Sequence, residues 1–395
     1  MSAPAHEDVR LGMLREAAAG RYERFVADLR TMTAIDCGSH DADGVDEAGA
    51  FAAARLRELG FEVRVVPMAG APGSALGSAV VARRRGRLPH GRSILLMAHL
   101  DTVYERGTAA ARPMRIENGI AYGPGVCDDK GGLLLGLLAA GALADADAED
   151  YAELTVLLTP DEEIGSPASR PLTESLAARA DFALCLECAR ENGDIVVARK
   201  GAVDLRITVR GRAAHSGVEP ERGANAALAA AHLVVALQRI AGVNVGRIRA
   251  GTRTNVVCDE AVLDAEVRAI GQAELDAAVR EIESLATRIW VPGTSAEVVR
   301  GEACPPLEHT SSGTALAAMA VGIAAELGFA LGAAETGGVA DANFAAGTGV
   351  PVLDGLGPVG GGDHSPAEWL DLASVVPRGT LLAALIARLG AGPRR

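Results

Sequence analysis

Residues 93–98 read Ser-Ile-Leu-Leu-Met-Ala, and the run stays apolar after the serine. A continuous apolar run of this length is typical of a strand that is buried on both faces of a sheet. Similar segments at 61–66, 77–82, 153–159 and 181–186 are separated by turns or by helical patterns. Strands that alternate with helices predict an α/β core in which helices pack against the sheet. The expected helices lie at about 8–31, 44–59, 129–144 and 170–179.

The pattern changes near residue 199. Residues 202–210 alternate between polar and apolar side chains, as in a strand with one face in solvent. Two strand–helix–strand halves follow, up to a break at 302–306, and an apolar helix at about 311–327 resumes the α/β style. A small domain inserted into a larger one is the simplest account. We therefore expect an α/β domain in residues 1–198 and 307–395, split by an α+β sandwich domain in residues 199–306.

Composition excludes several classes of function. The net charge of −13 argues against a surface for nucleic acid or for an anionic membrane. The first 30 residues lack a basic start followed by an apolar run, and no unbroken apolar stretch of about 20 residues stands out, so we expect neither a secretory signal nor a membrane span. The six cysteines are then expected to be free thiols, and the protein to be cytoplasmic.

Lysine is almost absent. Of 38 basic residues only Lys130 and Lys200 are lysines, and both lie next to glycine. Where arginine is the default, a retained lysine suggests a compact ammonium group that a guanidinium cannot replace. Chance placement of two residues remains the alternative.

Side chains that bind metals follow three of the predicted strands directly. They are His99 with Asp101, the pair Glu162 and Glu163, and Glu187. The carboxyl ends of strands are where such sheets bind ligands. Mixed histidine and carboxylate ligands suit Zn²⁺, with Co²⁺ or Mn²⁺ as substitutes. In the Glu162–Glu163 pair, one carboxylate can bind metal while the other acts as a general base, and Asp101 can orient His99.

Two loops add further candidates. One carries Asp128 and Asp129, either of which could bridge two cations, and the other carries His364. Each candidate also has a plainer explanation, because acidic residues cap helices and a lone histidine is often structural. Their conjunction at strand ends within one domain favours a metal site.

With these residues the chain resembles the M20 family of metallopeptidases, most closely its glutamate carboxypeptidase and aminoacylase branch. The resemblance implies a mixed-sheet zinc-peptidase catalytic domain, with a lid and dimerisation domain at 199–306, and a homodimer with two zinc ions per chain. The resembling segments are 97–103, 122–132, 161–166, Glu187, 211–217, 337–343 and 362–365.

The resemblance also implies roles for the metal-site residues. His99 and Glu187 would bind one zinc, Glu163 and His364 the other, and Asp128 would bridge both. Glu162 would be the general base, and Asp101 would orient His99. The peptide bond between Asp128 and Asp129 is expected to be cis.

In the inserted domain, the resemblance implies three substrate contacts. His215 would reach the active site of the partner subunit and polarise the scissile carbonyl. Asn255 and Arg268 would hold the terminal carboxylate of the substrate, for which an arginine fork is well suited. Gly337 and Gly338 would offer backbone contacts.

Several cysteines lie close to predicted ligands. Cys127 precedes Asp128, and Cys185 and Cys188 flank Glu187. A Cys-x-x-Cys spacing suggests a redox or zinc site. Because this segment continues a strand, its side chains should point apart, and we expect no thiol site.

The sequence therefore predicts a zinc hydrolase that cleaves the amide bond of a small peptide or N-acyl amino acid next to a free α-carboxylate. A deacylase or dipeptidase with the same chemistry is the alternative among enzymes. A binding protein on an inactive hydrolase scaffold is the alternative outside enzymes, although the complete set of ligands and base disfavours it. No nucleic acid or membrane partner is expected.

Overall fold

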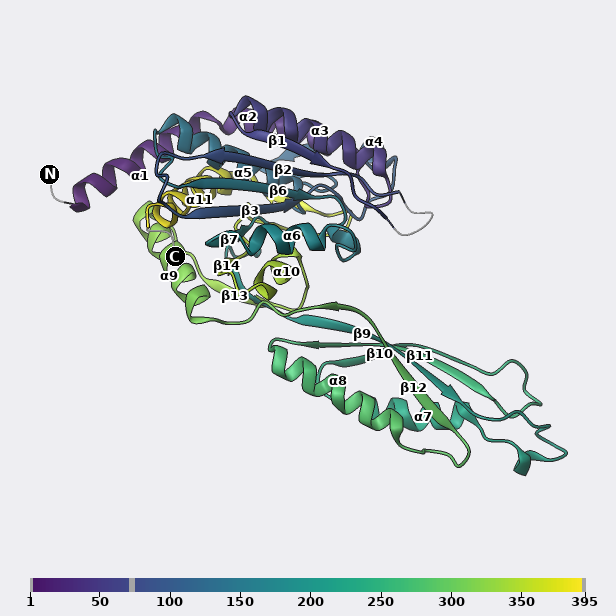
Figure 1. Cartoon of the computed structure of the whole chain (residues 1–395). Helices are drawn as coiled ribbons and strands as arrows, with labels where there is room; N and C mark the ends of the chain where they lie inside the picture. Colours follow the sequence, from purple (N-terminus) through teal and green to yellow (C-terminus); the bar gives the residue numbers. More distant parts are fainter. Residues whose placement is uncertain (1–2, 71–74, 393–395) are drawn as a thin grey trace. The chain divides into compact units, whose positions relative to one another are not determined.

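The computed structural model describes residues 3–70 and 75–392 (Figure 1). The chain forms two compact units, of which the first comprises Met1–Val197, His309–Thr336 and Ala340–Arg395. The second comprises Ala198–Glu308 together with Gly337–Val339. The second unit thus contains the segment expected as an insertion, 199–306, with one more residue at its start and two at its end. It also includes a short strap, Gly337–Val339, from later in the chain.

Unit 1 is built on a six-stranded sheet. Its neighbouring pairs are antiparallel at one edge and parallel from β6 onward, so the sheet is mixed, as the family resemblance implies. The strand order is β1 (Glu62–Val66), β2 (Ala79–Arg85), β6 (Glu153–Thr159), β3 (Ser93–His99), β7 (Phe182–Cys185) and β14 (Val352–Leu353). Every residue of β3 is buried, as its apolar sequence predicts.

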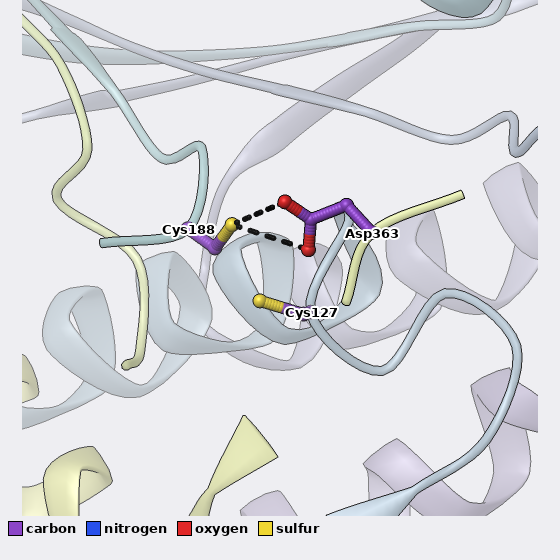
Figure 2. Close-up of side chains that lie close together, drawn as sticks. All are labelled: Cys127, Cys188 and Asp363. Carbon is purple, nitrogen blue, oxygen red and sulfur yellow. Dashed lines mark hydrogen bonds between the residues drawn. The ribbon is translucent and has the colours of Figure 1, made fainter. Parts of the chain in front are cut away.

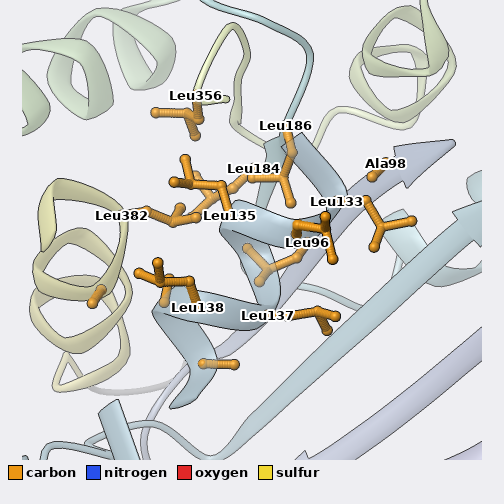
Figure 3. Packing of buried hydrophobic residues seen from close by; sticks show 14 of the residues in the cluster. Leu96, Ala98, Leu133, Leu135, Leu137, Leu138, Leu184, Leu186, Leu356 and Leu382 are labelled. Carbon is orange, nitrogen blue, oxygen red and sulfur yellow. The ribbon is translucent and has the colours of Figure 1, made fainter. Parts of the chain in front are cut away.

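The central helix of unit 1 is α5 (Lys130–Asp145). It is apolar on all sides and buried from Lys130 to Leu143, which is the pattern of a helix inside a core. It packs against β3 and against α11 (Val375–Gly390), and Figure 3 shows its leucines beside Leu96 and Leu382. The other helices of unit 1 are α1 (Ala3–Gly20), α2 (Tyr22–Thr33), α3 (Ala42–Glu58), α4 (Thr108–Ala111), α6 (Arg170–Ala177), α9 (Ser311–Leu327) and α10 (Asp341–Gly347).

One expectation for unit 1 needs correction. The single helix expected at 8–31 is two helices, because α1 ends at Gly20 and α2 begins at Tyr22.

Among the described residues, the stretch Leu372–Gly390, which includes α11, is long and apolar enough to cross a membrane by length and composition alone. Since 78% of its apolar window is buried inside the protein, it has the burial of a core helix.

A small sheet in unit 1 positions part of the site. Its order is β15 (Gly360–Gly361), β16 (Trp369–Asp371), β5 (Ile120–Tyr122) and β4 (Arg115–Glu117). Through this pairing, the segment before α5 lies beside the segment around residue 364, although about 240 residues separate them in sequence. Elsewhere β8 (Ile195–Arg199) pairs with β13 (Ala333–Thr336), and short 3₁₀ turns occur at Glu162–Ile164, Pro220–Arg222 and Leu372–Ser374.

Unit 2 is an α+β sandwich with its own hydrophobic core. Its antiparallel sheet has the order β10 (Val243–Ala250), β11 (Glu260–Ala269), β9 (Gly201–Arg210) and β12 (Ser295–Cys304). Helices α7 (Ala226–Leu237) and α8 (Gln272–Thr287) pack on it. The expectation that the strand pattern breaks at 302–306 needs correction. Strand β12 continues to Cys304, with a register shift between Arg300 and Ala303. A bulge of this kind disturbs the alternating pattern without ending the strand.

Candidate metal centre

Three neighbouring strands deliver metal-binding side chains to one edge of the main sheet. His99 is the last residue of β3, Glu163 lies in the turn after β6, and Glu187 follows β7 by two residues. Because β6, β3 and β7 are parallel neighbours, their carboxyl ends meet at the same edge. The small sheet brings Asp128 and His364 to that edge, which no spacing in the sequence specifies.

The donor atoms form two groups that share Asp128. On one side, His99 Nε2 lies 2.9 Å from Asp128 Oδ1 and 3.8 Å from Glu187 Oε1. On the other side, His364 Nε2 lies 3.2 Å from Asp128 Oδ2 and 3.0 Å from Glu163 Oε2. The atoms of each group lie within 4.8 Å of one another. Each group holds one imidazole and two carboxylates, and this donor set fits a pair of zinc ions with Asp128 between them.

The protein orients His99 for metal binding. Its Nδ1 lies 2.9 Å from the carbonyl oxygen of Asp101 and 3.4 Å from the carboxylate oxygen Oδ1 of the same residue. Both partners are acceptors, so Nδ1 carries a proton. In the metal-free chain Nε2 donates to Asp128 Oδ1, and loss of that proton would free Nε2 to bind a metal. The expected orienting role of Asp101 is therefore shared between its backbone and its side chain.

The carboxylate of Asp101 also holds the turn at Glu162–Ile164. It accepts hydrogen bonds from the backbone N–H groups of Glu162 and Glu163, each at 3.1 Å, and from Ser39 Oγ at 2.7 Å. Asp101 is fully buried. One residue thus positions a predicted ligand on β3 and the acidic pair after β6.

Negative charge accumulates at this edge. Burial, and then the neighbouring Glu187, Asp341 and Glu163 carboxylates, raise the pKa of Glu162 well above its ordinary range, although His99 opposes this. Burial also opposes ionisation of Asp128, but hydrogen bonds from His364 and His99 hold its pKa below the ordinary range. Bound dications would offset this concentration of carboxylates.

Zinc affinity should fall as the pH is lowered. In the metal-free chain, the hydrogen bond to Asp128 raises the pKa of His364 to about 9, and burial, followed by the charge of Asp128, raises the pKa of Glu163 to about 7. Protons compete with metal at both groups, so affinity should decline below about pH 9 and more steeply below about pH 7. Chelator competition across this range measures the effect, and a constant affinity would contradict it. In His364→Ala the decline above pH 7 should become shallower, and what remains should come from His99, whose pKa is also raised.

The peptide bond between Asp128 and Asp129 is cis, as the family resemblance implies. Asp129 itself points away from the shared group: its side chain is fully buried, and Oδ2 lies 3.4 Å from the backbone nitrogen of His99. Of the two carboxylates that could bridge two metals, the structure therefore places Asp128 between the histidines.

Glu368 is a positioning residue that the sequence did not reveal. Its buried carboxylate accepts hydrogen bonds from the backbone N–H groups of Gly125, Cys127 and Asp128 at 2.8, 2.8 and 3.1 Å, and from the hydroxyl of Tyr104 at 2.7 Å. It thereby holds the loop that carries Asp128. A lone glutamate four residues after a histidine carries no signal for such a role.

Replacing Glu368 with glutamine should destabilise the fold and weaken zinc binding. Each carboxylate oxygen accepts two hydrogen bonds, so the amide nitrogen of Glu368→Gln would meet at least one donor. We expect the free energy of unfolding to drop by roughly 1–3 kcal/mol. Chemical denaturation and zinc titration measure the two effects. Glu117→Gln, at an exposed glutamate, is the matched control. Equal unfolding free energies and equal zinc affinities in the two variants would show that Glu368 does not position the loop.

Lys130 fills a narrow buried space. Its ammonium donates to the carbonyl oxygens of Ile35 at 2.9 Å and Pro124 at 3.3 Å, and only 1% of the residue is exposed. A Cβ atom on Gly125 would already lie 3.1 Å from the lysine stem. This gives a physical reason for a lysine in an arginine-rich chain, because a planar guanidinium is larger.

The remaining predicted site residues lie in unit 2, in two separate places. His215 and Asn255 are close together. The backbone nitrogen of Ser216 donates to the carbonyl oxygen of Asn255 at 3.1 Å, and His215 forms an isolated antiparallel β-bridge with Val256. Arg268 lies near the far end of β11, where it donates to the carbonyl oxygen of Gly337 at 2.8 Å. Gly338 belongs to the same strap and accepts from Arg199 at 3.4 Å.

The guanidinium of Arg268 already has a carboxylate partner. Its Nε and Nη2 donate to the two oxygens of Glu266 at 2.6 and 2.9 Å. A substrate carboxylate at this position would share or displace that partner.

The cysteines are all free, as expected. Cys185 and Cys188 do not form a site with each other among the described residues. Instead, Cys188 lies with Cys127 and Asp363.

Residues 95–388 match the family described as Peptidase family M20/M25/M40. The chain is 35% identical to carboxypeptidase G2 of Pseudomonas sp. (strain RS-16), over 96% of this chain and 92% of that protein. It is 28% identical to succinyl-diaminopimelate desuccinylase of Alkalilimnicola ehrlichii, over 89% of this chain and 95% of that protein. Among solved structures, aminopeptidase PepT of Bacillus cereus superposes with a TM-score of 0.78 at 23% identity, covering 93% of this chain and 98% of that one.

Proposed function

Because the chain belongs to peptidase family M20/M25/M40, we propose that it is a two-zinc carboxypeptidase that releases an amino acid with a free α-carboxylate from a small peptide or N-acyl amino acid. The observation that carries the proposal is Asp128, whose two oxygens face two different histidine–carboxylate groups. The similarity to carboxypeptidase G2 over nearly the whole chain supports the carboxypeptidase class.

In this proposal His99 and Glu187 would hold one zinc, Glu163 and His364 would hold the other, and Asp128 would be shared by both. Bound zinc supplies Lewis acidity, which polarises the scissile carbonyl and makes water more acidic. Co²⁺ or Mn²⁺ would suit the same ligands.

Glu162 is the proposed general base. It follows β6 beside Glu163, and its backbone N–H is held by Asp101. Burial raises the pKa of Glu162, so its ionised carboxylate is a stronger base than an exposed glutamate: it takes a proton from the attacking water and returns it to the leaving amine. Asp101 keeps His99 and this turn in fixed positions while the proton is transferred.

Unit 2 is the proposed lid and dimerisation domain. His215 would polarise the carbonyl, Asn255 and Arg268 would bind the substrate carboxylate, and the backbone of Gly337 and Gly338 would line that contact. The stretch of β11 from Glu260 to Arg268 spans roughly 26 Å, with Asn255 beyond one end and Arg268 at the other. A single copy of unit 2 therefore cannot present His215 and Arg268 to one small substrate, which supports a homodimer.

Mixed dimers test this arrangement. His215→Ala and Arg268→Ala should each be strongly impaired alone, the latter mainly through a higher KM for carboxylate substrates. If the two residues reach one site from different copies, co-expressed variants should regain about one quarter of wild-type activity, because half of the dimers are mixed and each has one complete site. No recovery in verified mixed dimers would contradict the arrangement. The baseline activity comes from dimers purified in the same way from two differently tagged copies of His215→Ala.

The proposed function is tested by metal content and hydrolysis measured on one sample. We expect about two zinc ions per chain and chelator-sensitive release of an amino acid from N-acyl or N-aroyl amino acids. Two zinc ions without release from any peptide or N-acyl amino acid would refute the carboxypeptidase proposal. Failure to bind metal after addition of Zn²⁺, Co²⁺ or Mn²⁺ would refute the metal centre as well.

A deacylase is the second candidate, favoured by the similarity to succinyl-diaminopimelate desuccinylase. Both candidates share the metal centre and the base, and they differ in the acyl group. One substrate panel varies the acyl group with the amino acid fixed, and a second panel varies the amino acid with the acyl group fixed. The kcat/KM values across the two panels distinguish a carboxypeptidase from a deacylase.

A further inference from the structure

A second group of metal-binding side chains lies outside the ligand set described above. Cys127, Cys188 and Asp363 place one donor atom each within 4.8 Å of one another (Figure 2). They come from three separate segments: the loop before α5, the segment after β7, and the loop after β15. Each is the direct neighbour in sequence of a proposed ligand of the zinc pair.

The group is buried and closely packed. Cys127 is fully buried and Cys188 is 7% exposed. The thiol of Cys188 donates to both oxygens of Asp363, at 3.7 and 3.6 Å. A Cβ atom at position 360 would collide with the sulfur of Cys127, so the glycine there makes room for the thiol.

We propose that Cys127, Cys188 and Asp363 bind one soft divalent cation, with Cd²⁺ as the probe, at a site separate from the zinc pair and not counted among its two zinc ions. Thiolate ligands select soft cations, whereas the zinc pair is surrounded only by nitrogen and oxygen donors. Donors on one tetrahedral zinc lie about 3.5–3.8 Å apart, so small adjustments of the three side chains suffice. A water molecule would complete the fourth position.

The charges around such a site are of both signs. Binding releases one proton from each thiol to solvent, and two thiolates plus one carboxylate then exceed the dication by one negative charge. The guanidinium groups of Arg190 and Arg378 interact electrostatically with Asp363 and Cys188, respectively, and oppose this excess, whereas the carboxylates of Asp128, Glu187 and Glu368 near the thiols add to it. Arg378 is itself buried, where it donates to three backbone carbonyl groups.

Cadmium titration of the reduced, zinc-loaded full-length protein tests the proposal. Cadmium bound to thiolate gives an ultraviolet charge-transfer band that a site of histidine and carboxylate ligands cannot produce. We expect the band to saturate at one equivalent per chain in the wild type. It should be lost in Cys127→Ser and in Cys188→Ser. Cys258→Ser, which removes a buried thiol of unit 2, is the matched control and should keep the band.

Asp363→Asn keeps both thiols, so its band should remain but require more cadmium to saturate. This variant keeps the test informative if a serine variant fails to fold. A reduced wild type without the band, or a band of unchanged intensity in Cys188→Ser, would overturn the proposal. A thiol count that shows a Cys127–Cys188 disulfide in the protein as purified would do so too. The readout is independent of hydrolysis, so it stands or fails separately from the proposed function.

Discussion

Glu162→Gln should lower kcat by about 10²- to 10⁴-fold while the protein keeps two zinc ions per chain. The amide cannot accept the proton of the attacking water, and Glu162 is not among the residues whose donor atoms make up either metal group. The substitution preserves shape, and the backbone N–H of residue 162 still donates to Asp101. Stopped assays of amino-acid release, with zinc content measured on the same sample, give both quantities.

Glu163→Gln is the matched control for this prediction. Its carboxylate oxygen lies 3.0 Å from His364 Nε2, so this neighbour should lose zinc as well as activity. The two adjacent variants are therefore expected to separate base from ligand. Wild-type kcat in Glu162→Gln would remove the base assignment, and equal zinc loss in both variants would show that Glu162 is a ligand instead.

Asp128→Asn should reduce the zinc content from about two to one or fewer per chain and abolish turnover. Only one oxygen remains in the carboxamide, whereas the two carboxylate oxygens of Asp128 lie 2.9 Å from His99 Nε2 and 3.2 Å from His364 Nε2. Loss of the bridging charge also leaves two dications without an anion between them. Zinc analysis after dialysis and kcat measurement test this result.

Asp129→Asn is the control, because it changes the other carboxylate of the same pair. Burial, and then the charge of Glu187, raise the pKa of Asp129 well above its ordinary range. No described residue donates a hydrogen bond to its Oδ1, so a neutral side chain of the same shape should be tolerated. Two zinc ions retained in Asp128→Asn but lost in Asp129→Asn would reverse the assignment of the bridge.

Several features of the fold and the site could be predicted from local sequence. The apolar run at 93–98 predicted a buried strand, and β3 is buried throughout. The alternating pattern at 202–210 predicted a strand with one exposed face, and β9 alternates in that way. Residues at strand ends, such as His99, could be assigned to a common edge because parallel strands share one direction.

Other features depended on contacts between distant segments. Glu368 gains its neighbours in the loop before α5 only when the small sheet forms, because pairing of β16 with β5 joins segments about 250 residues apart. The separation of His215 from Arg268 follows from the length of β11, and spacing in the sequence did not reveal it.

By itself, the sequence determined which residues could act as ligands and base, since side-chain chemistry and strand periodicity are local properties. From side-chain chemistry alone either Asp128 or Asp129 could bridge, and the family resemblance implied Asp128; the tertiary structure places the carboxylate of Asp128 between the two histidines. It also decided that Cys188 meets Cys127, and not Cys185. The physical reason is the same in both cases. Which of two adjacent side chains points into a site depends on backbone geometry and on partners far away in the chain.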